Sequence, residues 1–82
     1  MTFWLSFADP GRPKGTQFLG VAIVVADDFL TAVRKAHALG INPGGEVQGA
    51  GTALLPASKY LDRLLTKEEA EKADASFGVG DA

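Results

Sequence analysis

The stretch Phe18-Leu19-Gly20-Val21-Ala22-Ile23-Val24-Val25-Ala26, followed at once by Asp27-Asp28, decides the fold. A continuous apolar run that becomes β-branched toward its end is typical of a central strand covered on both faces. Gly20 inside the run predicts a bulge or a close approach of another backbone. Since a small domain has little material to cover two faces, the run also points to a partner subunit.

The two aspartates begin the clearest helix of the chain. Their carboxylates can cap free amides and suit the positive end of the helix dipole. Gly40 stands where a left-handed residue ends many helices, so the pattern predicts a helix over residues 28–39. His37 falls beside the apolar arc, and we expect it at the margin of the core rather than in a catalytic site. The arc contains Phe29, Leu30, Ala32, Val33, Ala36 and Leu39.

Upstream of the central run, residues 2–8 alternate between apolar and other positions. Phe3, Leu5 and Phe7 share one face, which predicts a strand with that face buried. Trp4 then lies on the other face of the sheet. Residues 9–17 contain prolines and glycines and read as a loop between two strands.

Downstream of the helix, residues 40–51 are rich in glycine. Asn42-Pro43-Gly44-Gly45 predicts a tight turn, and two short edge strands, 46–48 and 52–55, are expected around it. Helical spacing of Tyr60, Leu61, Leu64 and Leu65 predicts a short helix over 57–65.

Thr66 and Glu69 have the spacing of a capping box, which predicts a last helix over residues 67–75. The chain of 82 residues and 8.5 kDa therefore forms one α+β domain over residues 1–76, with a flexible C-terminal tail at 77–82. The predicted architecture is a small antiparallel sheet packed against one main helix, with short C-terminal helices.

Composition excludes several classes of function. The net charge is −2 and the basic residues form no stripe, so no nucleic-acid partner is expected. The chain has no cysteine and one histidine, which argues against a metal site and a cysteine nucleophile. No apolar run is long enough for a membrane span and no signal peptide is recognisable, so a cytoplasmic location is expected. No catalytic residues and no cofactor are predicted.

One candidate site is a small anion-binding surface. Arg12 and Lys14 would supply positive charge, and Asn42, Gly44 and Gly45 would supply amides that bind phosphate or carboxylate oxygens. The alternative is that the glycines only form turns and the cations are ordinary solvated charges. Glu46 stands where a nucleotide-binding loop requires lysine, and the sequence does not place the two loops together.

A second candidate is a protein interface formed by Trp4, Phe18 and Tyr60. Exposed tryptophan is enriched at the centres of protein interfaces. The competing interpretation is that residues 60–65 fold over Trp4 and bury it. The sequence leaves both possibilities open.

Three stretches resemble a family of small uncharacterised proteins of bacteria and their phages. They are Phe3-Trp4-Leu5-Ser6-Phe7-Ala8-Asp9-Pro10, Pro13-Lys14-Gly15-Thr16-Gln17-Phe18-Leu19-Gly20-Val21 and Gly40-Ile41-Asn42-Pro43-Gly44-Gly45-Glu46-Val47. The resemblance covers most of residues 3–72. It implies a microbial origin and a stand-alone small protein, and it carries no activity, cofactor or functional residue.

These observations predict a small non-enzymatic binding module that acts through protein–protein contacts and self-association as a homo-oligomer. The alternative is a protein that binds or sequesters an anionic, nucleotide-like small molecule. The two hypotheses differ in the surface they require, which is Trp4 for the first and Arg12 with Lys14 for the second.

Overall fold

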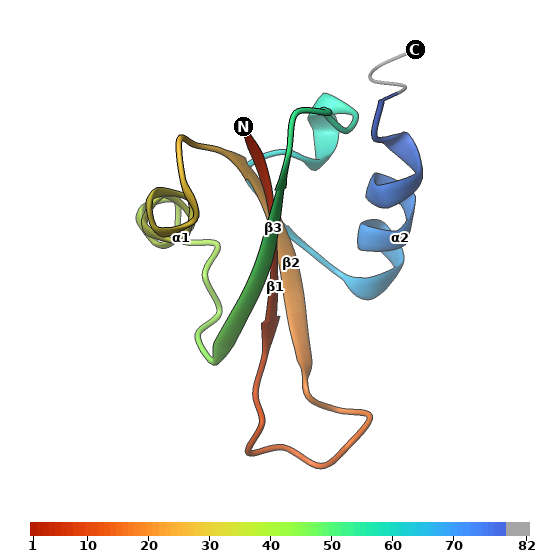
Figure 1. Ribbon diagram of the computed structural model, residues 1–82. Helices are drawn as coiled ribbons and strands as arrows, with labels where there is room; N and C mark the ends of the chain where they lie inside the picture. Colours follow the sequence, from red (N-terminus) through yellow and green to blue (C-terminus); the bar gives the residue numbers. More distant parts are fainter. Residues whose placement is uncertain (79–82) are drawn as a thin grey trace.

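A computed structural model describes residues 1–78 of the chain. It contains a single sheet with one helix on each side, and Figure 1 shows the sheet edge-on. The elements in chain order are β1 (Thr2–Ala8), β2 (Phe18–Val25), α1 (Phe29–Ala38), β3 (Glu46–Thr52), the 3₁₀ turn η1 (Ser58–Tyr60), β4 (Leu64–Leu65) and α2 (Lys67–Ser76).

The four strands lie in the order β3-β1-β2-β4, and every neighbouring pair is antiparallel. The predicted α+β class and the packing of the main helix on the sheet are therefore confirmed. The covering of β2 differs from the expectation. α1 covers one face of the sheet and α2 the other, so a single chain buries both faces of β2 (Figure 1). The argument that a partner subunit helps to cover this strand is therefore wrong, because one chain supplies both covers.

The face under α1 holds the larger apolar core. Phe3, Leu5 and Phe7 all point into it, as their spacing at every second residue predicted, and they pack against Ala32 and Ala36 of α1. The small alanines let the helix approach the sheet closely. The apolar arc of α1 is narrower than the sequence indicated, because Leu30, Leu39 and also His37 are exposed. The placement of His37 at the core margin was therefore wrong.

The face under α2 is built from the other side of the same strands. Val21 and Ile23 of β2 pack there with Tyr60, Leu65 and the two buried alanines of α2, Ala70 and Ala73. The alternation of β2 thus supplies both cores, since Ala22 and Val24 belong to the opposite one. α2 lies over the β2–β4 side of the sheet and contacts these two strands.

Gly20 allows both features that the sequence predicted. The register of β1 and β2 shifts between Phe7, which faces Gly20, and Ala8, which faces Phe18, so Leu19 is the extra residue of a bulge. Gly20 has φ +150°, and a Cβ there would lie 2.6 Å from the Leu64 side chain. The bulge therefore depends on glycine for its backbone angle and for the close approach of β4.

Both helices begin at the residues that the sequence identified. The Asp28 carboxylate accepts a hydrogen bond from the Thr31 amide (2.7 Å), and Thr66 with Glu69 forms the complete capping box of α2. Gly40 has φ +73° just beyond α1, as predicted for a helix stop. The observed helices match the predicted ranges to within one residue at each end.

The region between β3 and α2 differs most from the prediction. Residues 57–65 form no α-helix; they contain η1 and then β4, and Asp62 between them has φ +59°. Tyr60 and Leu65 still reach the core, which explains their spacing, while Leu64 is exposed. The two short strands expected at 46–48 and 52–55 are instead one strand, β3, at the predicted edge position.

The predicted tail begins inside the packed domain. The ring of Phe77 lies against Trp4, and the Gly78 amide donates a hydrogen bond to the Leu55 carbonyl (3.1 Å). Both residues therefore belong with α2. The remainder of the predicted tail, 79–82, lies outside the described residues.

Candidate functional site

Trp4 stands at the boundary between the covered and uncovered parts of the α2 face. It lies in the middle of β1, opposite Ile23 of β2 on one side and Ala50 of β3 on the other. Phe77 at the end of α2 covers part of the indole, with ring centroids 6.0 Å apart and ring planes tilted by 50°. Trp4 is half-buried as a result. The segment that contacts the indole ring is the end of α2, whereas the sequence left open a cover by residues 60–65.

A groove begins at Trp4 because α2 does not extend over β3. Residues of β1, β3, the following loop and α2 enclose a volume of about 380 Å³. Its lining is mostly apolar, and Leu54 in this lining is 54% exposed. We call this the Trp4 groove. It is lined by Trp4, Ala50, Thr52, Leu54, Asp74 and Phe77.

A second hollow continues the groove along α2 toward the β1–β2 loop. It has a volume of about 260 Å³ and shares Trp4 and Asp74 with the Trp4 groove. Phe18, which is 40% exposed, lines this part together with Lys67 and Glu71 of α2. The structure therefore brings two predicted interface residues, Trp4 and Phe18, onto one surface.

Tyr60, the third predicted interface residue, does not belong to this surface. Its side chain is 8% exposed and packs in the core under α2. Lys59 lies over its ring with Nζ 5.1 Å from the ring centroid. Tyr60 thus stabilises the domain, and little of its ring is left for a contact with another molecule.

Five lining residues of the Trp4 groove were not among the predicted site residues: Ala50, Thr52, Leu54, Asp74 and Phe77. A signal existed for Phe77, because it continues the apolar spacing of Ala70 and Ala73 by one more turn, directly after the end of the helix. Leu54 and Ala50 carry no such signal. Their position depends on β3 lying next to β1, which the local sequence does not specify.

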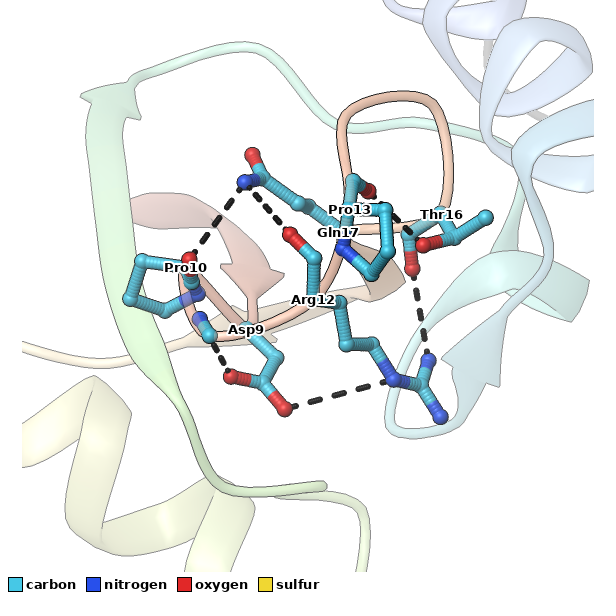
Figure 2. Close-up of polar contacts among 7 residues, drawn as sticks. Asp9, Pro10, Arg12, Pro13, Thr16 and Gln17 are labelled. Carbon is cyan, nitrogen blue, oxygen red and sulfur yellow. Dashed lines mark hydrogen bonds and ion pairs between the residues drawn. The ribbon is translucent and has the colours of Figure 1, made fainter.

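The loop 9–17, which contains the predicted cations Arg12 and Lys14, is stabilised by contacts among its own residues. Figure 2 shows the Arg12 side chain directed along its own loop, toward the Asp9 carboxylate (Nε to Oδ2, 4.0 Å) and the Thr16 carbonyl (3.4 Å). Gln17 donates from its side-chain amide to the carbonyls of Arg12 (3.0 Å) and Pro10 (3.5 Å). Asp9 and Arg12 thus offset each other's charge. Lys14 lies exposed on the same loop.

The turn that contains Asn42, Gly44 and Gly45 also has a structural role. The Asn42 side-chain oxygen accepts a hydrogen bond from the Gly44 amide (2.8 Å). Gly44 has φ +88° and Gly45 has φ +73°, values that favour glycine. A Cβ at Gly45 would collide with the Ala8 carbonyl. This turn and the cationic loop lie at the same end of the sheet, since Ala8 pairs with Glu46.

Two carboxylates of the described residues have clearly displaced pKa values, and both are helix caps. The backbone amide of Thr31 holds the pKa of Asp28 below its ordinary value of 3.8. The backbone amide of Thr66, helped less by the Arg63 guanidinium, likewise lowers the pKa of Glu69 from 4.5. Both shifts are explained by capping. Residues 1–78 contain no group of three or more acidic, histidine or cysteine side chains arranged to hold a metal ion.

Comparisons with family models, with curated proteins and with solved structures found no match. The resemblance to small bacterial and phage proteins therefore stays a prediction. In the described part of the chain, no helix has both the length and the apolar character needed to cross a membrane.

Proposed function

We propose that this protein is a small non-enzymatic binding module that acts through protein–protein contacts and self-association. The observation that carries the proposal is the Trp4 groove, where an indole and the exposed Leu54 side chain line an open apolar depression. Large apolar side chains in such a position contribute much of the energy of many protein interfaces. Trp4 is half-buried, so part of its indole stays accessible beside Leu54 for such a contact.

The chemistry of the groove favours a particular kind of occupant. Trp4, Ala50, Leu54 and Phe77 offer apolar surface, and Asp74 is the ionisable residue in the lining. A complementary segment would insert an apolar side chain beside Trp4 and place a basic residue near Asp74. We therefore propose that the occupant is a segment of a partner protein with an apolar residue next to a lysine or arginine.

A peptide selection tests this proposal. A library of random peptides is selected against the full chain, and binding is measured by the emission of Trp4, which is the only tryptophan. We expect the selected peptides to shift this emission and to pair apolar with basic residues. Leu54→Asp in the groove should weaken their binding at least tenfold.

Leu55→Asp provides the matched control. Leu55 is 51% exposed, nearly the same as Leu54, but it lines a separate hollow with Met1 and Val25. Peptides that bind without changing Trp4 emission, and that are insensitive to Leu54→Asp, would contradict the proposed groove.

The anionic-ligand hypothesis has less support, because Arg12 contacts Asp9 and Thr16 of its own loop. We expect millimolar nucleotides and inorganic phosphate to leave the Tm unchanged in a thermal-shift measurement. A rise in Tm that disappears in Arg12→Ala and Lys14→Ala would favour the hypothesis over protein binding.

A further inference from the structure

The hydrogen-bonding groups of β3 are divided between its neighbour β1 and the open edge of the sheet. The Ala26 amide donates to the Met1 carbonyl (2.9 Å), and these two residues continue the β1–β2 register by one position beyond the pair Thr2 and Val25. In an antiparallel pair, hydrogen-bonded and non-hydrogen-bonded positions alternate. Odd-numbered residues of β1 therefore bond to β2 and even-numbered ones to β3.

The same alternation fixes the orientation of β3. Trp4 faces Ala50 and Ser6 faces Gln48, so the even-numbered residues of β3 direct their amides and carbonyls to β1. The odd-numbered residues direct theirs away from the sheet. An outward row of donors and acceptors results, formed by Val47, Gly49 and Gly51.

This edge has none of the features that usually prevent strand pairing. Natural edges are protected by lysine, proline, bulges or a covering segment. β3 contains no lysine or proline, its single charge is Glu46 at the first position, and its register with β1 is regular. In Figure 1, β3 is nearest the viewer; the chain enters it from the α1 side and leaves on the α2 side, and no described segment crosses it.

We infer that β3 pairs antiparallel with β3 of a second copy of this chain, centred on Gly49, so that one sheet continues through a two-fold dimer. The inference rests on the self-association in the proposed function and specifies its surface. Gly49 then faces itself, and Val47 faces Gly51 of the second copy. Each of these pairs exchanges both of its backbone hydrogen bonds.

The side chains of β3 are complementary to themselves in this register. On the α1 face, Val47 is placed beside a glycine, Gly51 of the second copy, so no two bulky groups meet. On the α2 face, Gln48 lies opposite Ala50 of the second copy. The carboxylates of the two Glu46 residues are at opposite ends of the paired strands, so like charges do not face each other. These features favour a second copy over an unrelated strand.

Cysteine cross-linking tests the register. The chain has no cysteine, so Gln48→Cys and Ala50→Cys each introduce a single thiol. In the inferred register position 48 faces position 50 in a non-hydrogen-bonded pair, where Cα atoms are about 4.5 Å apart and a disulfide fits. Oxidation of an equimolar mixture should give the mixed disulfide in at least tenfold excess over both symmetric ones.

Two charge variants test the pairing without cross-links. Gln48→Lys combined with Ala50→Lys places lysines opposite each other across the dimer, whereas Gln48→Lys combined with Ala50→Glu places opposite charges there. Both positions are exposed, so each variant should keep the fold of the single chain. Sedimentation equilibrium should give a Kd of dimerisation at least tenfold weaker for the double lysine variant.

Amide hydrogen exchange locates the contact in the unmodified chain. At high concentration the amides of Val47, Gly49 and Gly51 should gain protection, while those of Gln48 and Ala50 are protected at every concentration. A symmetric disulfide in excess would overturn the register. A dimer without these changes would overturn the inference and leave self-association intact, and a monomer at millimolar concentration would contradict both.

Discussion

The two edges of the sheet are finished in opposite ways. Beyond β2, several outward groups near the end of the strand have partners. Val21 and Ala22 pair with β4, the Ile23 carbonyl accepts from the Asp62 amide (2.9 Å), and the Val25 carbonyl accepts from Lys35 Nζ (3.1 Å). Beyond β3, the described chain supplies no such partner. The single chain therefore closes the edge beside β2 with short, irregular segments. It leaves the longer and more regular edge strand, β3, without a partner in the described residues.

The largest effect is expected at the closed edge. Leu65 in β4 is 1% exposed and packs in the core under α2, so Leu65→Ala removes buried apolar volume. We expect a loss of about 2–5 kcal/mol in the free energy of unfolding. Urea denaturation measures it, and Leu64→Ala, at the 38% exposed neighbour, serves as the control with a smaller loss. Equal losses would mean that β4 does not close the core.

At the open edge, the opposite faces of β3 should respond differently to the same side chain. A Cβ at Gly49 would lie 2.6 Å from the Phe29 ring, so Gly49→Val should destabilise the fold by about 1–3 kcal/mol despite the strand propensity of valine. Ala50→Val adds the same branched side chain on the exposed face and should change the stability little. Thermal unfolding of both variants decides the point. If Gly49→Val were as stable as Ala50→Val, the contact between Phe29 and β3 would be in doubt.

The start of α2 directly after β4 offers a smaller perturbation. Thr66→Ala removes the hydroxyl that accepts a hydrogen bond from the Glu69 amide (3.2 Å). We expect the free energy of unfolding to fall by about 1 kcal/mol. Thr66→Ser retains the hydroxyl, and its free energy of unfolding should be close to that of the original protein. Circular dichroism during urea unfolding gives both values, and an unchanged midpoint for Thr66→Ala would show that the cap contributes nothing.

The smallest effect is the pH dependence that comes from the two caps. Asp28 and Glu69 have pKa values that are lower in the folded chain than their ordinary values of 3.8 and 4.5. The stability that the two ionised carboxylates contribute is therefore complete above about pH 5. It is lost as the pH falls through their lowered pKa values in the folded chain. Glu69→Gln should reduce the fall of Tm with acid below pH 4.5, measured by calorimetry between pH 3 and 6. An identical acid profile in this variant would remove Glu69 as a cause.

The sequence predicted those parts of the fold in which the local pattern and the tertiary contacts agree. The alternation of Phe3, Leu5 and Phe7 predicted the buried face of β1, and the acidic residues before Phe29 predicted the start of α1. The capping box at Thr66 did the same for α2. In each case a few neighbouring residues contain both the signal and its physical reason.

The failures lie where distant contacts replace a local rule. Gly49 and Gly51 made β3 look like two broken strands, yet Phe29 covers Gly49, and Met1 and Phe3 lie over Gly51. Tyr60 and Leu65 have helical spacing, but η1 and the left-handed Asp62 bring them to the core without a helix. The Trp4 groove was predicted only through Trp4 and Phe18, because its other wall depends on where β3 and the end of α2 are placed.

The place of β1 between β2 and β3 has a consequence for the order of folding. β1 meets β2 across a short loop, whereas its other neighbour arrives only after α1 and the glycine-rich turn have been made. Closing the longer loop costs more chain entropy, and the glycines of β3 add conformational freedom that must be given up. We therefore expect the hairpin to form early and β3 to dock late. In a stopped-flow experiment, variants in β3 would mainly accelerate unfolding, while those in the hairpin would slow refolding.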